Sequence, residues 1–252
     1  MIKDDYLINK YVMANFPLFP CPSCESTLHP TFKNPLFHEE SAGSKAFQES
    51  GEGDIDNVEG VFSLHLRCGN TKCAEDVFCV GNFTMTPDES PIDETLSYVP
   101  SLEIRFFNPP IPIFPIHPKL KSGHGLRVGK ALEESFSLFW SNPSGAGNSL
   151  RTAVEALMDY RAIKKEGLTL HARLEIFKKS FKANHPALAD LGDKLLAIKW
   201  IGNSGSHISG LTRENMIHAY KLFANVIDEL FNNTSAKLSA TAKAINRTKK
   251  PI

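Results

Sequence analysis

Five cysteines, all before residue 80, are the residues with the clearest chemical potential. Cys21 and Cys24 are separated by two residues, and Cys68 and Cys73 by four. Each pair can place two thiolates on one side of a turn, about 2.3 Å from a shared zinc ion. Two such pairs supply the four thiolates of a closed site, which is the structural rather than the catalytic type of zinc site. The sequence therefore predicts structural Zn2+ bound by Cys21, Cys24, Cys68 and Cys73.

Two alternatives to this zinc site stay open. In the first alternative, the cysteines are unrelated reduced thiols. In the second, the zinc ion is catalytic, and His29 and His38 are nearby in the sequence. A disulfide framework is disfavoured, because the cysteine count is odd and the expected compartment is reducing. Cys79 falls inside an expected strand and is interpreted as a buried core residue.

The elements that position the thiolates follow from the pattern around the second pair. Residues 61–67 and 76–85 are expected to form strands that lead into and out of the turn at Cys68–Cys73, which is the arrangement of a zinc ribbon. Gly69 and Asn70 in that turn can adopt positive φ. Residues 39–59 are acidic and contain Gly and Ser, which is typical of a mobile loop inserted into the ribbon. Residues 102–107 are expected to add a further strand.

The pattern changes after residue 108. Five prolines between positions 109 and 118 exclude a helix or a central strand there. Beyond residue 125, apolar residues recur at helical spacing in about five segments, and Thr212 with Asn215 is expected to begin the last of these helices. We therefore predict an α+β protein: a zinc-ribbon-like β domain over 1–108 with an acidic loop insertion, a proline-rich linker over 109–125, an all-α bundle over 126–233, and a basic, disordered tail over 234–252.

The segment from Lys199 to His207 is the one unusual feature of the helical part. A helix ends there in a polar, glycine-containing stretch that presents Asn203 and His207. His207 titrates near neutral pH and can serve as a general acid or base. The alternative is a simple helix end, capped by Gly202 and Asn203. Trp200 can stack on a nucleobase, but the residue type favours a buried position.

Three motifs in order resemble a known family. They are Ser149–Leu157 on one expected helix, Leu196–Asn203 with His207, and Leu211–Glu214 at the start of the last helix. This stretch, about residues 147–231, resembles the bacterial domain of unknown function 4145 and is similar to the HEPN superfamily of helical bundles. A zinc ribbon in front of such a domain is an arrangement also found in similar chains.

The resemblance implies RNA chemistry. Many HEPN domains are metal-independent endoribonucleases that act as dimers and carry an arginine four to six residues before a histidine. Carried over, His207 would be the general acid/base and Asn203 an orienting residue. This chain lacks an arginine at that spacing, and the nearest upstream cation is Lys199, eight positions away. The remaining candidates lie on other helices: Arg151, Arg213, and Glu155, which either pairs with Arg151 or faces the Asn203–His207 segment.

Charge is divided between the two halves of the chain, although the net charge is zero. Residues 1–125 hold 17 Asp and Glu against 9 Lys and Arg, and residues 126–252 hold 11 against 19. The basic half is expected to meet RNA or another polyanion, or to pair with the acidic half. A composition that is 42% hydrophobic excludes a disordered chain. The sequence also predicts no membrane span and no signal peptide, and hence a cytoplasmic protein.

These observations lead to two functional hypotheses. The first is a zinc-containing module that binds nucleic acid or protein, and the resemblance extends it to a homodimeric effector in bacterial antiphage defence. RNA would bind the C-terminal half, and a protein partner the zinc ribbon. The alternative is a metal-independent endoribonuclease that uses His207 in a dimeric cleft, with Asn203, Lys199, Arg151 and Glu155 as the other candidate catalytic residues.

Overall fold

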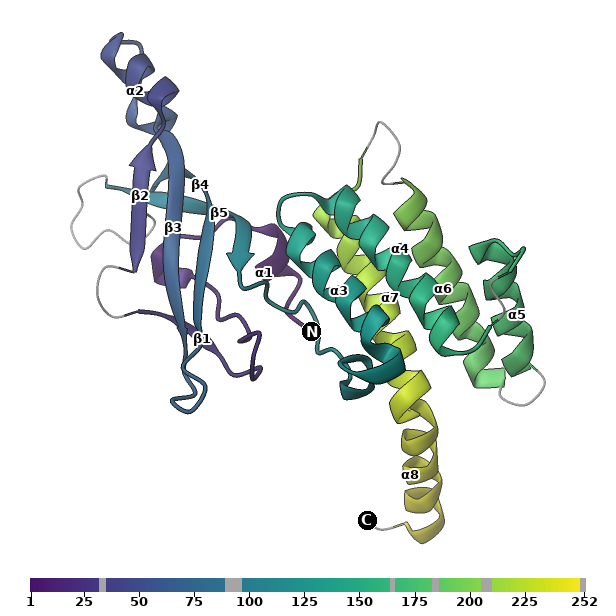
Figure 1. Ribbon diagram of the computed structural model, residues 1–252. Helices are drawn as coiled ribbons and strands as arrows, with labels where there is room; N and C mark the ends of the chain where they lie inside the picture. The colour runs from purple at the N-terminus through teal and green to yellow at the C-terminus, as the bar shows by residue number, and fades with distance from the viewer. Residues whose placement is uncertain (32–34, 89–96, 164–165, 183–185, 205–209, 250–252) are drawn as a thin grey trace. The chain divides into compact units, whose positions relative to one another are not determined.

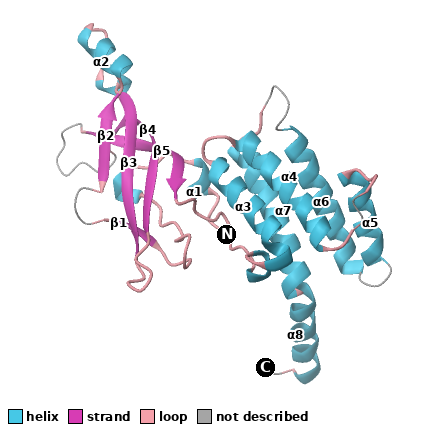
Figure 2. Ribbon diagram, in the orientation of Figure 1, coloured by secondary structure: helices cyan, strands magenta, loops and turns pink. Residues whose placement is uncertain are grey.

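A computed structural model describes the chain except for residues 32–34, 89–96, 164–165, 183–185, 205–209 and 250–252 (Figure 1). The chain divides into two compact units, and each is described here by itself. The first comprises Met1–Pro115 and Phe136–Asn142, and the second comprises Ile116–Ser135 and Pro143–Ile252. All strands among the described residues belong to the first unit, whereas the second is helical (Figure 2). The α+β class predicted from the sequence is confirmed.

The first unit is built on an antiparallel sheet of five strands. They are β1 (Leu28–Pro30), β2 (Leu36–Glu40), β3 (Glu59–Cys68), β4 (Asp76–Pro87) and β5 (Tyr98–Asn108). β1 and β2 both pair with β3, which pairs with β4, and β4 pairs with β5. The hairpin of β3 and β4 is the one expected from the sequence, with Cys68 and Cys73 in its turn. A short helix, α1 (Asp5–Ile8), precedes the sheet.

The inner face of the sheet forms the core of this unit. Residues of β3 and β4 alternate between buried and more exposed positions, as the two-residue period of a strand requires. The buried set includes Phe62, Leu64, Val77, Cys79 and Phe83. An aromatic cluster lies in the same unit, where the ring of Phe19 is 5.1 Å from that of Phe107 and 5.8 Å from that of Trp140.

The insertion at residues 39–59 is more ordered than expected. It contains the end of β2 and a helix, α2 (Ala42–Glu49). The Ser41 side chain caps this helix by accepting a hydrogen bond from the Ser44 backbone amide. The Ser44 hydroxyl in turn donates to the Glu40 carboxylate at 2.6 Å. The prediction of a mobile loop was wrong because these local polar contacts stabilise a short helix despite the acidic composition.

The helical region contains the predicted bundle of about five helices. They are α3 (Leu126–Phe139), α4 (Pro143–Tyr160), α5 (Leu170–Lys182), α6 (Pro186–Ser204) and α7 (Arg213–Asn232). α7 begins as expected, since the Thr212 hydroxyl accepts from the Asn215 amide. The core of the second unit includes Leu150, Leu157, Leu174, Phe177, Leu195, Tyr220 and Phe223. Among the described helices, none is both long and apolar enough to cross a membrane.

Two segments that the sequence predicted to lack regular structure, the proline-rich linker and the C-terminal tail, are ordered in part. Residues 109–125 are largely extended, yet Ile111 and Ile113 are fully buried, because a proline-rich stretch still carries apolar side chains between the prolines. The expected disordered tail instead forms α8 (Thr234–Thr248). Its start is anchored by Ser235, whose hydroxyl donates to the Glu229 carboxylate at 2.5 Å. Its alanine-rich sequence favours helix without needing a buried face.

Candidate functional site

The four predicted cysteine ligands converge in the first unit. The Sγ atoms of Cys21, Cys24, Cys68 and Cys73 all lie within 4.8 Å of one another. Cys21 Sγ is 3.8 Å from Cys73 Sγ, and Cys24 Sγ is 3.5 Å from Cys68 Sγ. Four sulfurs placed tetrahedrally about 2.3 Å from one ion would stand about 3.8 Å apart. The thiols therefore already have the spacing of a closed tetrahedral metal site.

Each pair of cysteines lies in a tight turn of the same design. In the first, the Glu25 amide donates to the Cys21 carbonyl at 2.9 Å, and in the second the Ala74 amide donates to the Asn70 carbonyl at 2.9 Å. The residue after the second cysteine of each turn has positive φ, 63° for Glu25 and 50° for Ala74. The left-handed conformation thus falls on these residues and not on Gly69 or Asn70, where the sequence pattern suggested it.

Gly69 has a different role. A Cβ atom there would lie 3.0 Å from the ring of His29, so glycine lets the turn pack against β1. The Gly69 amide also donates to the Thr27 carbonyl at 2.9 Å. A further bond joins the two turns, since the Ser23 hydroxyl donates to the Glu75 carboxylate at 2.5 Å. These contacts hold the two cysteine pairs in register with each other.

The surroundings of the four thiols shift their pKa values in different directions, lowering that of Cys24 and raising those of Cys21, Cys68 and Cys73. Hydrogen bonds from the Ser26 side chain and backbone lower the pKa of the Cys24 thiol to about 6. Burial raises the pKa of the Cys21 and Cys68 thiols, so these two need a cation to remain ionised. The Asn70 amide hydrogen points at Cys68 Sγ with an N to S distance of 3.4 Å. Such outer donors orient the ligands of a metal site.

The donor set determines what this site can do. Among the described residues, neither a histidine nor a carboxylate joins the four cysteines in the cluster. His29 packs on Gly69, and the His38 ring contacts Phe83 at 5.2 Å. Four protein ligands leave no open position for water or substrate, so the site suits a structural ion rather than catalysis. Cys79 is fully buried on β4, away from the cluster, and burial raises the pKa of its thiol far above the ordinary value.

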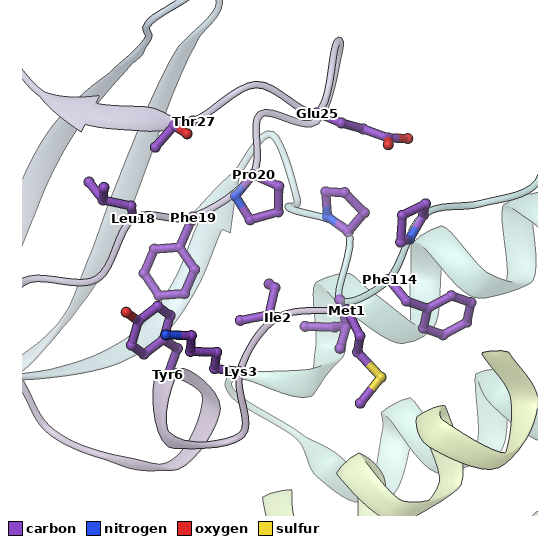
Figure 3. Close-up of a pocket in the computed structure, with 13 residues that line it drawn as sticks. Met1, Ile2, Lys3, Tyr6, Leu18, Phe19, Pro20, Glu25, Thr27 and Phe114 are labelled. Atoms are coloured by element: carbon purple, nitrogen blue, oxygen red, sulfur yellow. The ribbon is translucent and has the colours of Figure 1, made fainter. Parts of the chain in front are cut away.

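A pocket of about 340 Å³ lies in the same unit, next to the first cysteine turn (Figure 3). Its wall includes Tyr6, Phe19 and Pro20, and it extends to Phe114 in the proline-rich segment. Of the lining residues that the structure describes, Lys3 and Glu25 carry charge, and the Lys3 ammonium lies 5.5 Å from the centroid of the Tyr6 ring. The lining is otherwise mostly apolar and does not assemble a catalytic group.

In the second unit, α4 and α6 bring together part of the predicted helical site. A Cβ atom at Gly202 would lie 2.8 Å from Arg151 Cβ and 2.8 Å from the Gly147 carbonyl oxygen. The two helices therefore touch where both lack side chains, at Gly147 and Gly202. This contact places Arg151 against Gly202, which lies near the end of α6 and directly precedes Asn203.

Arg151 is paired within its own helix. Its Nη2 lies 2.9 Å from Glu155 Oε1, one helical turn away. Its Nε is buried and finds no hydrogen-bond partner among the described residues. The guanidinium thus has one satisfied edge and one unsatisfied nitrogen beside Gly202. The structure therefore places Arg151 beside Gly202 and pairs Glu155 with Arg151, whereas His207 lies outside the described residues.

Trp200 is exposed, and the expectation of a buried ring was wrong. Its exposed fraction is 54%, and the Lys199 ammonium lies 3.4 Å from the ring centroid. The His171 ring on α5 is 6.3 Å from it. The reason is the helical period, since Leu195 and Ile198 define the buried face of α6 and Trp200 falls about 200° around the helix from Ile198.

Sequence reasoning also missed the exposed apolar residues on the outer face of the sheet. Phe37, Val61, Phe78 and Phe106 are all exposed. The alternation of β3 and β4 could have signalled it, because large apolar residues occupy both the inward and some outward positions.

The fold and the cysteine cluster define a two-unit protein, with a β unit whose four clustered cysteines could hold a metal ion and a helical unit. Family models agree with this division. The domain of unknown function DUF8608 matches residues 9–109, and the domain of unknown function DUF4145 matches residues 133–248. The second match confirms the resemblance predicted from the sequence. A search of curated proteins and one of solved structures found no match.

Proposed function

We propose that this chain is a zinc-stabilised nucleic-acid-binding protein whose helical unit binds single-stranded RNA at the exposed surface around Lys199 and Trp200 on α6. The observation that carries the proposal is Trp200, a half-exposed indole beneath the Lys199 ammonium. An exposed aromatic ring with adjacent cations is the usual platform on which an unpaired base stacks beside its phosphate. A tryptophan placed only for packing would be buried.

Charge supports the same assignment. The second unit holds 21 Lys and Arg against 11 Asp and Glu, whereas the first holds 7 against 17. A polyanion is therefore attracted to the helical unit and repelled by the β unit. One cation stands directly beside the Trp200 platform, since the Lys199 ammonium lies 3.4 Å from the centroid of the ring.

Zinc is the proposed occupant of the cysteine site. Four thiolates in tetrahedral spacing favour zinc or an iron–sulfur centre over harder ions. Sγ separations of 3.5 and 3.8 Å suit a single small ion. Its role is to hold the β unit together, because one ion would bind cysteines from both turns and add to the Ser23–Glu75 and Gly69–Thr27 hydrogen bonds.

The proposal has three further parts. The helical unit is a HEPN-type bundle, the protein is a homodimer, and it acts as an effector in bacterial antiphage defence. These parts rest on the resemblance of Ser149–Leu157, Leu196–Asn203 and Leu211–Glu214. In this view the β unit recruits a protein partner while the helical unit engages RNA.

Binding of a labelled single-stranded RNA of mixed sequence, followed by fluorescence anisotropy, tests the site. Stacking of one base contributes about 1–3 kcal/mol, so Trp200→Ala should weaken binding about 5- to 150-fold. Lys199→Gln should weaken it less and lower the salt slope by about one. Ile176→Ala, an exposed apolar change on α5, is the matched control and should bind as wild type. Unchanged affinity of the Trp200 variant would refute the proposed surface.

A second function, metal-independent RNA cleavage, is favoured by one observation: an arginine reaches the end of α6 from α4. Arg151 in that position can replace the arginine that many HEPN ribonucleases carry four to six residues before the histidine, and that this sequence lacks before His207. The 2′-oxygen would bond to the adjacent phosphorus as its proton passes to His207, and a cation would stabilise the phosphorane. The P–O5′ bond would then break, the 5′-oxygen would leave with a proton as a hydroxyl, and a 2′,3′-cyclic phosphate would remain.

Cleavage is tested in EDTA with structured and single-stranded RNA, beside His207→Ala, with circular dichroism to verify the fold after chelation. Cutting by the wild type alone would establish the ribonuclease. Intact RNA with both proteins, together with Trp200-dependent binding, would leave the chain as a binding module.

A further inference from the structure

The outer face of the sheet carries a continuous apolar row. Phe37 on β2 pairs with Ser63, Ser63 with Val80, and Val80 with Phe106 on β5, so these four residues stand side by side across the sheet. Phe37 is 63% exposed and Phe106 is 41% exposed. Because strands are about 4.8 Å apart, the row is about 14 Å long.

Neighbouring positions extend this row into a patch. Val61 and Phe78 lie on the same face and are exposed, and the ring of His65 stacks on Phe78 at 4.7 Å. We call the set of Phe37, Val61, Phe78, Val80 and Phe106 the outer patch. Monomeric proteins seldom expose a contiguous apolar area of this kind without a partner.

The border of the outer patch carries two carboxylates at one end, and each forms an ion pair within the unit. Glu39 pairs in register with Val61 and Glu103 with Asn82 on the same face, and their carboxylates contact Lys45 and Arg105, respectively. A groove of about 360 Å³ opens at that end, and its lining includes Glu59, Glu103 and one lysine, Lys10. Since the unit as a whole has a large excess of carboxylates, the occupant that fits is apolar with a positive net charge.

The chain itself carries an element of that description. α8 has two exposed apolar residues two turns apart, Leu238 at 65% and Ile245 at 40%, and it buries no residue. Its charged residues are Lys237, Lys243 and Arg247, with no acidic residue between 234 and 248. Leu238 and Ile245 are about 10 Å apart along the axis, which fits the outer patch.

We propose that the outer patch binds α8 of a second copy of this chain, and that two copies exchange this contact reciprocally. The proposal is independent of nucleic-acid binding. Within its own unit, no described element covers either surface, both carry exposed apolar residues, and the β unit and α8 have opposite net charges. Reciprocal exchange doubles the buried area and closes the assembly with two-fold symmetry, so no filament forms.

Light scattering coupled to size-exclusion chromatography of the full-length chain tests the pairing. The wild type should show twice the chain mass of 27.9 kDa. Phe106→Asp in the patch and Leu238→Asp in α8 should each reduce the mass to that of one chain. The matched controls are Phe47→Asp on α2 and Ile176→Asp on α5, which are exposed apolar residues outside both surfaces and should leave the dimer intact.

Mixing the two monomeric variants distinguishes this pairing from others. The intact α8 of the Phe106→Asp chain can bind the intact patch of the Leu238→Asp chain, so the mixture should regain a dimer. Loss of the dimer in only one of the two variants would indicate a helix–helix or a sheet–sheet contact and overturn the proposal. A monomeric wild type at all concentrations would also overturn it.

Folding and function are checked separately. Circular dichroism and metal content should match the wild type in every variant, and Phe37→Ser with Ile245→Ser provide a milder second pair. Trp200→Ala should remain dimeric, so failure of the RNA surface and failure of the dimer cannot be confused.

Discussion

Gly202→Ala tests the close approach of α4 and α6 that builds the helical site. The added methyl would stand 2.8 Å from Arg151 Cβ and 2.8 Å from the Gly147 carbonyl oxygen. Neither atom is the far end of a flexible side chain, so the helices themselves must separate. We expect the second unit to lose stability and Arg151 to move away from the end of α6.

The magnitude follows from two opposing effects. Overpacking a tight contact costs about 1–3 kcal/mol. Alanine is preferred over glycine in a helix by about 1 kcal/mol, and the gain is smaller at Gly202, two residues from the end of α6. The net expectation is a destabilisation of about 1–2 kcal/mol.

Gly147→Ala is the matched control from the same contact. Its methyl would meet Leu211 Cδ1 at 2.6 Å, which a rotation of the leucine side chain can relieve, and Gly202 Cα only at 3.6 Å. The helix preference should then offset the repacking, and the stability should change little. Urea unfolding followed by circular dichroism measures both variants. Equal stability of Gly202→Ala and wild type, or a larger loss in Gly147→Ala, would refute the reasoning.

Three further outcomes are expected. Cys24→Ser should lose the bound metal ion, measured by elemental analysis, whereas Cys79→Ala should retain one ion per chain because Cys79 lies outside the cluster. Arg173→Met should destabilise the second unit by about 2–4 kcal/mol in urea, because it removes a 4%-exposed guanidinium that lies 2.6 Å from Asp159. Hydrogen bonds from Arg67 and His65 lower the pKa of Asp76 to about 2. The stabilisation is therefore present above the ordinary pKa near 3.8 and is lost as the pH falls toward 2, so the difference in urea midpoint between wild type and Asp76→Asn should shrink over that range.

The metal centre was predictable from the sequence because its determinants are local. Two cysteines in one short turn must lie close together whatever the rest of the fold does. The hairpin between Cys68 and Cys73 also has a local signature of alternating residues, which the β3–β4 register confirms. What spacing could not predict is which residue adopts positive φ, because Glu25 and Ala74 have no intrinsic preference for it and accept it to close their turns.

Elements that depend on long-range contacts were harder to predict. β1 and β2 are three and five residues long and exist because they pair with β3, so their own sequences carry little signal. α8 was missed because it buries nothing, and periodicity detects helices through their buried face. Trp200 could have been placed correctly, since the stripe through Leu195 and Ile198 already put it on the opposite side of α6.

The proposed contact of α8 with the sheet leaves most of the positive charge of this helix exposed. Counting about 100° per residue, Lys243 and Arg247 lie about 140° and 180° around the helix from Leu238. Those two cations therefore still face solvent when the Leu238–Ile245 stripe docks on an outer patch, and only Lys237 borders the contact. The acidic β unit then lies beneath a helix whose remaining positive charge points outward. Such a dimer would leave the basic residues Lys243 and Arg247 accessible to RNA. Salt should consequently weaken RNA binding steeply and the apolar α8–sheet contact only slightly.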